Sequence, residues 1–277
     1  MIENLDQNQI IFLISIMALT AIPVGFVAGL FGIGGGLITV PFLYYIFGSI
    51  GFDQAYLMHL AVGTSFAIII PTSIVSVLTH RKHNAVDIKI IKNYGIFVII
   101  GVLSGTIFAA LLKTKSLLLF FTIIVYFLGA YLLNLKDKAN RIKKNFRLKP
   151  RILLGFASGF ISAPMGIGGA VMNVPILRYF GYPINKAIGS AAAIGFIIAF
   201  FGAIGFLISG SFLKADLPLS VGFINIPAFL IFIPITMFMA RVGANTVHKL
   251  DKSKLQRFFG IFLYVVGTIF LYRYLNI

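Results

Sequence analysis

The stretch GLFGIGGGLITVP, from Gly29 to Pro41, is rich in glycine and yet lies inside a long apolar run. Two nucleotide-binding patterns do not fit it. A G-x-G-x-x-G fingerprint starting at Gly32 would need glycine where Leu37 stands, and a phosphate loop would need a lysine, whereas the first lysine is Lys82. Adjacent glycines would each weaken a continuous helix by about 1 kcal/mol relative to alanine. We therefore predict a helix break at residues 34–36.

The whole chain has the composition of a membrane protein. Its 277 residues are 59% hydrophobic and only 11% charged, and the mean hydropathy is +1.01. A soluble domain carries about 25% charged residues. Several apolar runs are about twenty residues long, which matches the hydrocarbon thickness of a bilayer. We predict an all-α polytopic membrane protein in contact with the lipid bilayer. Because the chain has no cysteine, disulfides and thiolate metal sites are excluded.

The net charge of +16 does not indicate a nucleic-acid partner. The lysines and arginines lie between the apolar runs, where they set the orientation of a membrane protein. The basic loops also lack the interleaved aromatic residues of a nucleic-acid surface.

The chain contains an internal repeat. Residues 32–43 align without a gap on residues 166–177, with seven of the twelve positions identical. The other matched blocks are 25–29 with 155–159, before four extra residues in the second copy, and 61–65 with 187–191. We predict a first transmembrane repeat at 1–135, a basic cytoplasmic linker at 136–151 and a second transmembrane repeat at 152–277.

Each half is expected to hold a glycine-broken hairpin followed by three transmembrane helices, which makes eight to ten membrane segments in all. The predicted spans are 59–79, 90–112, 117–135, 187–209, 218–240 and 255–274. The second hairpin, 152–180, is too short to cross twice, and whether the hairpins are re-entrant or fully spanning is left open.

The two halves are expected to be inverted relative to each other, because each makes an odd net number of crossings. With both termini outside the cytoplasm, 19 of the 23 lysines and arginines fall in inner loops. The four that remain outside are Lys113, Lys115, Lys214 and Arg273.

The paired breaks predict an anion site. Half-helix N-termini near the midplane of inverted-repeat transporters direct N–H groups at anionic substrate. The candidate substrate-binding residues at the two breaks are Gly34, Gly35 and Gly36, and Gly168, Gly169 and Ala170. The polar candidates are the matched pairs Thr39 with Asn173 and Thr64 with Ser190, together with Asn225. The alternative for the polar side chains is a hydrogen bond to a neighbouring helix carbonyl. The pairs Gly25/Gly29 and Gly155/Gly159 are interpreted as helix-packing positions.

No cofactor or metal site is expected. The carboxylates of Asp53, Asp87 and Asp216 all fall near the ends of predicted spans, which argues against an intramembrane cation site. The chain also lacks G-x-S-x-G and H-E-x-x-H motifs, so an integral membrane enzyme has no support.

The blocks GFVAGLFGIGGGLITVP and GFASGFISAPMGIGGAVMNVP resemble the sulfite exporter TauE/SafE family of membrane transporters. The resemblance implies a multi-pass permease of the inner cell membrane that moves sulfur-containing anions such as sulfite or organosulfonates. The positions of this sequence that match the family's motif are Gly32, Gly34, Gly35, Gly36 and Pro41, and Gly166, Gly168, Gly169 and Pro175. Ala170 departs from the third glycine of the first copy, so the two half-sites are expected to be unequal.

We therefore expect a secondary transporter that moves a small anion by alternating access. Two alternatives are an anion channel and a membrane scaffold whose glycines only pack helices. Proton coupling, the direction of transport and the oligomeric state are left open.

Overall fold

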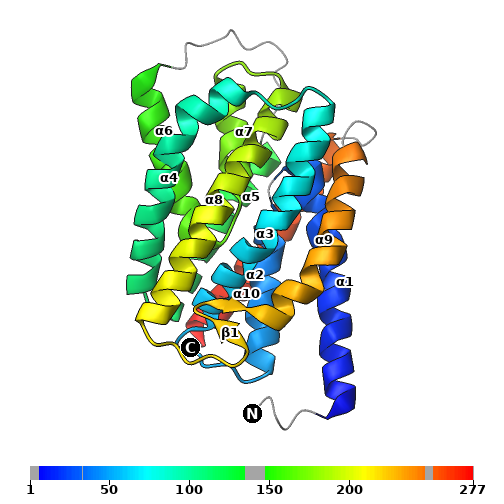
Figure 1. The fold of residues 1–277 in the computed structure, drawn as a ribbon, viewed down its shortest axis with the longest axis vertical. Helices are drawn as coiled ribbons and strands as arrows, with labels where there is room; N and C mark the ends of the chain where they lie inside the picture. The colour runs from blue at the N-terminus through cyan, green and yellow to red at the C-terminus, as the bar shows by residue number, and fades with distance from the viewer. Residues whose placement is uncertain (1–5, 33, 135–146, 247–251, 277) are drawn as a thin grey trace.

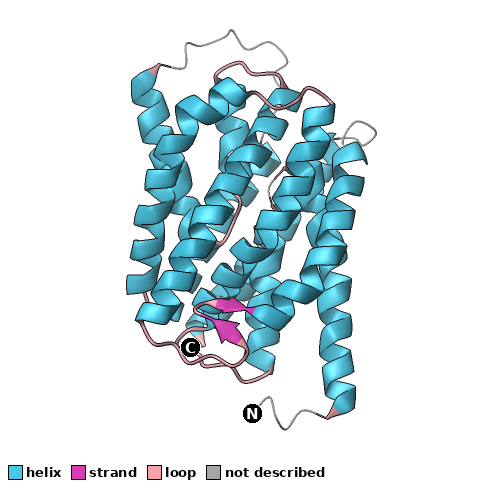
Figure 2. Ribbon diagram, in the orientation of Figure 1, coloured by secondary structure: helices cyan, strands magenta, loops and turns pink. Residues whose placement is uncertain are grey.

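The computed structural model describes residues 6–32, 34–134, 147–246 and 252–276, and its helices run between two ends of the molecule (Figure 1). In chain order the helices are α1 (Gln7–Phe31), α2 (Gly36–Ser49), α3 (Leu57–Lys82), α4 (Ile88–Leu111), α5 (Thr114–Asn134), α6 (Leu148–Met165), α7 (Ala170–Tyr179), α8 (Ile184–Phe212), α9 (Ile226–Thr246) and α10 (Lys252–Leu275). Two short strands, β1 (Ser220–Val221) and β2 (Ile224–Asn225), form an antiparallel hairpin between α8 and α9 (Figure 2).

The prediction of an all-α polytopic membrane protein is confirmed. Within the described residues, 7 helices are long and apolar enough to cross a membrane, and α2 is a shorter apolar helix. The 14 residues of α2 and the 10 of α7 span about 21 Å and 15 Å at 1.5 Å per residue. A hydrocarbon core is about 30 Å thick. The second helix of each hairpin is therefore too short to cross, as a re-entrant hairpin requires.

Both predicted helix breaks are present. In the first hairpin, α1 ends where Gly32 takes φ 66°, and Gly35 takes φ 78° immediately before α2. In the second, Gly166 takes φ 63° after α6, and Gly169 takes φ 68° before α7. Glycine is favoured in this left-handed region because it has no Cβ. The intervening Ile33 lies outside the described residues.

The helix pair α3 and α8 lies at the centre of the fold. These helices pack on each other, and α2 packs on α3 while α7 packs on α8. Around them α3 also packs on α9 and α8 on α4, whereas α1 packs on α9, α6 on α4 and α5 on α10. Figure 1 shows α4 and α6 on one side of the central pair and α1 and α9 on the other.

The glycines interpreted as helix-packing positions lie where helices touch. A Cβ on Gly29 would overlap the backbone of Ala240 on α9, and a Cβ on Gly159 would overlap the backbone of Val98 on α4. Such contacts let helix backbones approach closely, which is the usual role of small residues between membrane helices.

One predicted boundary is wrong. The span expected at 218–240 begins only at Ile226, because the preceding residues form the β-hairpin and Asn225 caps α9 by accepting a hydrogen bond from the N–H of Ala228 at 3.0 Å. Asn225 therefore precedes the helix instead of lying inside it. The linker at 136–151 stays a prediction. Residues 136–146 lie outside the described residues, and α6 already begins at Leu148.

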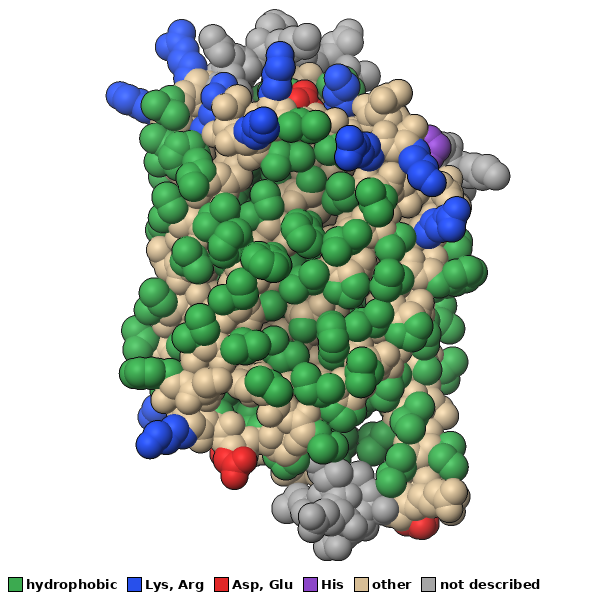
Figure 3. Space-filling model, in the orientation of Figure 1, with side chains coloured by type: hydrophobic (Ala, Val, Ile, Leu, Met, Phe, Trp, Pro, Cys, Tyr) green, Lys and Arg blue, Asp and Glu red, His purple; other side chains and the backbone are tan. Residues whose placement is uncertain are grey.

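Charge and apolar surface divide along the long axis. On the face shown in Figure 3, lysine and arginine side chains gather mostly at one end, and a broad apolar band covers the middle. The β-hairpin, the start of α1 and the end of α10 lie at the other end (Figure 1). We call the two ends the basic end and the hairpin end.

Candidate functional site

The two helix breaks touch at the centre of the molecule. A Cβ on Gly36 would overlap the carbonyl oxygen of Gly166 and lie 2.8 Å from the Cα of Ile167. A Cβ on Gly34 would lie 3.4 Å from the Cα of Gly168. A side chain at Gly36 would therefore force the two helical hairpins apart, whereas one at Gly34 would be in ordinary contact with Gly168. We call the four glycines 34, 36, 166 and 168 the break junction.

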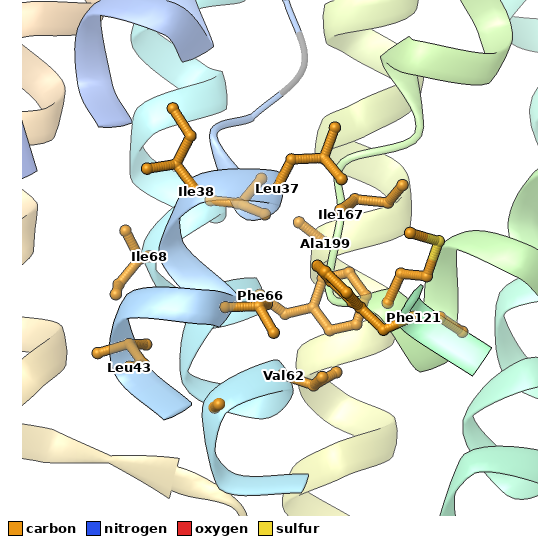
Figure 4. Close-up of a cluster of buried hydrophobic side chains, with 14 of the residues drawn as sticks. Leu37, Ile38, Leu43, Val62, Phe66, Ile68, Phe121, Ile167 and Ala199 are labelled. Carbon is orange, nitrogen blue, oxygen red and sulfur yellow. The ribbon is translucent and has the colours of Figure 1, made fainter. Parts of the chain in front are cut away.

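The break junction is surrounded by apolar side chains. Leu37 from α2 and Ile167 from the second break are buried beside it, and Val62 and Phe66 of α3 belong to the same core (Figure 4). A polar group at the junction is therefore far from water, where its hydrogen bonds are electrostatically stronger than in bulk solvent.

Each break offers the amides of a helix N-terminus. The first hydrogen bonds of α2 run to the carbonyl of Gly35 from the N–H groups of Ile38 and Thr39, and those of α7 run to Gly169 from Met172 and Asn173. The amides that precede them have no acceptor within their own helix. Such N–H groups carry the positive end of the helix dipole and favour an anion.

The side chains of Thr39 and Asn173 both donate locally. Thr39 Oγ donates to the carbonyl of Gly35 at 3.1 Å, and Asn173 Nδ2 donates to the carbonyl of Gly169 at 2.8 Å. Each bond runs four residues back, to the residue that precedes the same helix. Both side chains are fully buried, one at each break.

Asn173 is also the centre of a polar network that the sequence did not indicate. Its Oδ1 accepts hydrogen bonds from the hydroxyls of Tyr94 at 2.8 Å and Ser158 at 2.9 Å. Tyr94 lies on α4 and Ser158 on α6. Tyr94 lies outside the matched blocks, and Ser158 stands in block 155–159 where the first copy has Ala28, so the repeat pattern did not select either residue.

Thr64 and Asn225 are partners, away from the break junction. Thr64 Oγ on α3 accepts a hydrogen bond from the backbone N–H of Asn225 at 2.9 Å, at the hairpin end of the molecule. Next to it, a Cβ on Gly63 would overlap the carbonyl of Phe223. The β-hairpin is therefore fitted closely against α3.

Ser190 makes the corresponding contact at the basic end. Its Oγ on α8 accepts a hydrogen bond from the backbone N–H of Asp87 at 2.9 Å, and a Cβ on Gly189 would overlap the carbonyl of Ala85. The loop between α3 and α4 lies at that end (Figure 1). The structure thus places the predicted glycines with Thr39 and Asn173 at the breaks, and places Thr64, Asn225 and Ser190 at the ends of the central helix pair.

Ser65 is a further residue at the break junction that the sequence analysis missed. Its Oγ donates to the carbonyl of Gly166 at 2.9 Å, so it links α3 to the second break. Ser65 lies in the matched block 61–65, but Ala191 stands at its position in the second copy. The repeat pattern therefore gave no reason to select it.

The carboxylates of Asp53 and Asp87 accept hydrogen bonds from backbone groups near helix ends. The Asp53 carboxylate accepts a hydrogen bond from the N–H of Ala55, and that of Asp87 accepts from the N–H groups of Lys89 and Ile90 at the start of α4. In the part of the chain that the structure describes, no three His, Cys, Asp or Glu side chains come together as metal ligands would.

Comparison with known proteins gives a consistent result. The model of a family described as Sulfite exporter TauE/SafE matches residues 17–270. A probable membrane transporter protein of Haemophilus influenzae is 33% identical over 244 residues, which cover 88% of this chain and 92% of that protein. One from Methanocaldococcus jannaschii is 25% identical, covering 96% and 98%. The probable membrane transporter protein YunE of Bacillus subtilis is 25% identical, covering 93% and 97%. No solved structure matches the chain.

Proposed function

Because the chain belongs to the sulfite exporter TauE/SafE family of membrane transporters, we propose that it moves a small sulfur-containing oxyanion, such as sulfite or an organosulfonate, by alternating access. The observation that carries the proposal is the break junction, where two helix N-termini from different halves of the chain meet inside an apolar core. Membership of a transporter family favours a carrier over an enzyme.

The chemistry of the junction suits an anion. The starts of α2 and α7 supply backbone N–H groups and the positive ends of two helix dipoles. The carboxylates of Asp53 and Asp87 are bound to backbone groups near helix ends and do not compete for that site. Irregular backbone at membrane depth is tolerated where it is buried in protein or lines a cavity, which is the setting of both breaks.

The helix packing supports a pair of inverted repeats. The contacts of α1 on α9 and of α3 on α9 have counterparts in α6 on α4 and α8 on α4. The two ends of the central helix pair are closed by equivalent contacts, from the hydroxyl of Thr64 at one end and Ser190 at the other. In an alternating-access cycle, one contact opens while the other stays closed.

The distribution of charge supports an orientation. Lysine and arginine gather at the basic end, and basic residues are enriched in cytoplasmic loops. We place the basic end in the cytoplasm and both termini outside it. In a bacterial cell this corresponds to the inner membrane.

The experiment that tests the proposal is uptake of labelled sulfite and of a labelled alkylsulfonate into proteoliposomes, with and without an imposed pH gradient. We expect saturable uptake, and a response to the gradient would identify proton coupling. Flux that rises linearly with concentration would identify a channel instead. A folded protein that moves neither anion would overturn the proposed substrate class and favour the scaffold.

Two glycine variants of α2 sharpen the experiment. Gly36→Ala would place a methyl group against the carbonyl of Gly166, whereas the nearest neighbour of a Cβ on Gly48 is the Leu57 side chain at 3.4 Å. Uptake should be lost with Gly36→Ala and kept with Gly48→Ala. Equal loss with both variants would contradict a special role for the break junction.

A further inference from the structure

The second hairpin carries one helical turn that the first lacks. Gly159 and Gly166 enclose four more residues than their counterparts Gly29 and Gly32. Four residues are about one α-helical turn of 3.6 residues, so the insertion moves the break along α6 and keeps the same face toward its neighbours. The inserted turn contains Ser162, which is fully buried.

The Ser162 hydroxyl has no partner among the described residues. Its Oγ is buried and makes no hydrogen bond to them. Burying a hydroxyl without a hydrogen bond is unfavourable, and native proteins seldom do it without a reason. A Cβ built on Gly169 would lie 3.2 Å from this oxygen. The unsatisfied hydroxyl therefore points at the residue that caps the N-terminus of α7.

At the corresponding place the side chains of the first hairpin are apolar, and the polar neighbour is the carbonyl oxygen of Val24, 2.9 Å from a Cβ built on Gly35. A Cβ on Gly35, the residue before α2, would lie 2.7 Å from Cγ1 of Val24 and 3.5 Å from Cβ of Ala28. On Gly169 it would overlap Cδ1 of Ile198, and it would also meet two polar atoms, Asn173 Nδ2 at 3.1 Å and Ser162 Oγ at 3.2 Å. The two breaks share their backbone conformation but differ in the side chains that face them.

We infer that Ser162 donates a hydrogen bond to the oxyanion at the N-terminus of α7, so that the second half of the protein holds the charge of the substrate. This inference rests on the proposed function and assigns the anion to one of the two breaks. The Thr39 hydroxyl and one N–H of the Asn173 amide donate to backbone carbonyls, whereas the Ser162 hydroxyl has no hydrogen bond to the described residues and donates to the anion without losing one. A hydrogen bond to a charged acceptor is stronger than one between neutral groups.

The test compares two buried serines that both lack a partner in the described structure. Ser76 on α3 is buried and has no hydrogen bond, as Ser162 does, but it lies on another helix. Purified parent, Ser162→Ala and Ser76→Ala proteins are compared by uptake of sulfite and an alkylsulfonate. The rise in unfolding temperature that each anion produces gives a second readout, which does not depend on transport.

We expect Ser162→Ala to raise the KM for the anion by about tenfold or more, as the loss of a hydrogen bond to a charged group does. The anion should also stabilise this variant less than the parent. Without anion its unfolding temperature should be unchanged or higher, because an unsatisfied hydroxyl has been removed. Ser76→Ala should leave the KM at the parent value.

An unchanged KM and unchanged stabilisation by anion in Ser162→Ala would overturn this inference and leave the proposed function intact. A parent protein that neither moves nor is stabilised by either anion would overturn the proposed function, and this inference with it. If Ser162→Ala does not fold, Ser162→Cys decides the question. It keeps the size of the side chain, but its thiol is a weak donor, so the KM should still rise.

Discussion

The Thr64 hydroxyl on α3 accepts a hydrogen bond from the backbone N–H of Asn225, with the oxygen and nitrogen 2.9 Å apart. At the opposite end of the molecule, Ser190 on α8 accepts one from the N–H of Asp87, also at 2.9 Å. Each hydroxyl holds the segment that begins α9 or α4 against one end of the central helix pair. Each end of the proposed transport path is therefore held closed by a separate hydrogen bond.

Removing one hydroxyl should therefore loosen one end only. Because the natural chain has no cysteine, a single introduced thiol reports on its surroundings without background. We expect Ser190→Ala to raise the rate of thiol labelling at Ala85→Cys severalfold and to leave Ile224→Cys unchanged. Thr64→Val should do the reverse. Both reporter positions are buried in the parent structure.

The controls for this experiment keep the hydroxyl. Ser190→Thr and Thr64→Ser retain an acceptor for the buried N–H, so labelling should stay at the parent rate. If either hydroxyl-deleted variant raised the labelling rate equally at both reporters, the cause would be a general loss of stability. That result would contradict the idea that each end is held by its own hydrogen bond.

The break junction should not tolerate a methyl group. Gly36→Ala would place its Cβ against the carbonyl of Gly166, and overpacking a well-filled core costs about 1–3 kcal/mol. We expect a lower unfolding temperature for this variant in detergent. Gly48→Ala on the same helix has room and a better helix former, so its unfolding temperature should match or exceed that of the parent. A Gly36→Ala protein as stable as Gly48→Ala would show that the two breaks do not touch.

Asn173 should matter more for stability than its repeat counterpart Thr39. Asn173→Leu removes the acceptor that the hydroxyls of Tyr94 and Ser158 share. Tyr94 keeps the carbonyl of Leu154 at 3.1 Å, but Ser158 loses its bond to Asn173, and an unsatisfied buried group costs about 1–3 kcal/mol. Thr39→Val removes a single bond to Gly35 and keeps the shape of the side chain. Thermal unfolding of the two variants should therefore show the larger loss for Asn173→Leu. Equal losses would mean that the network around Asn173 adds nothing.

The proposed orientation is testable from outside the cell. Lys89 at the start of α4 and Lys214 after α8 are both exposed, at the basic end and the hairpin end respectively. A membrane-impermeant thiol reagent added to spheroplasts should label Lys214→Cys and not Lys89→Cys. Both should react after permeabilisation, which controls for accessibility. The opposite pattern would reverse the orientation.

The membrane helices and the breaks could be predicted because their causes are local. An apolar run of about twenty residues can lower its free energy in lipid only as a spanning helix, whose backbone groups are paired within the segment. The glycines at 34–36 and 168–169 favour a break because glycine has a low helix propensity. The start of α9 was predicted wrongly, because hydropathy does not distinguish the β-hairpin before Asn225 from the helix after it.

The candidate site could be predicted only in part. The glycines and the position of Asn173 followed from the aligned copies, and the structure places them at the two breaks. Ser65 and Ser162 were missed, because each stands where the other copy has a different residue or none. Positions shared by both copies were visible in the alignment, whereas those that distinguish the copies were not.

By itself the sequence determined that this protein is helical, lies in a membrane and breaks its helices at two glycine motifs. These properties depend on the hydropathy and backbone preferences of residues that are close together in the sequence. Only the tertiary structure decided which groups meet. The hydrogen bond between Thr64 and Asn225 joins residues 161 positions apart, and Ser162 faces Gly169 because of how α6 and α7 fold back on each other. Whether a buried hydroxyl forms a hydrogen bond between two elements or has no partner depends on what packs against it.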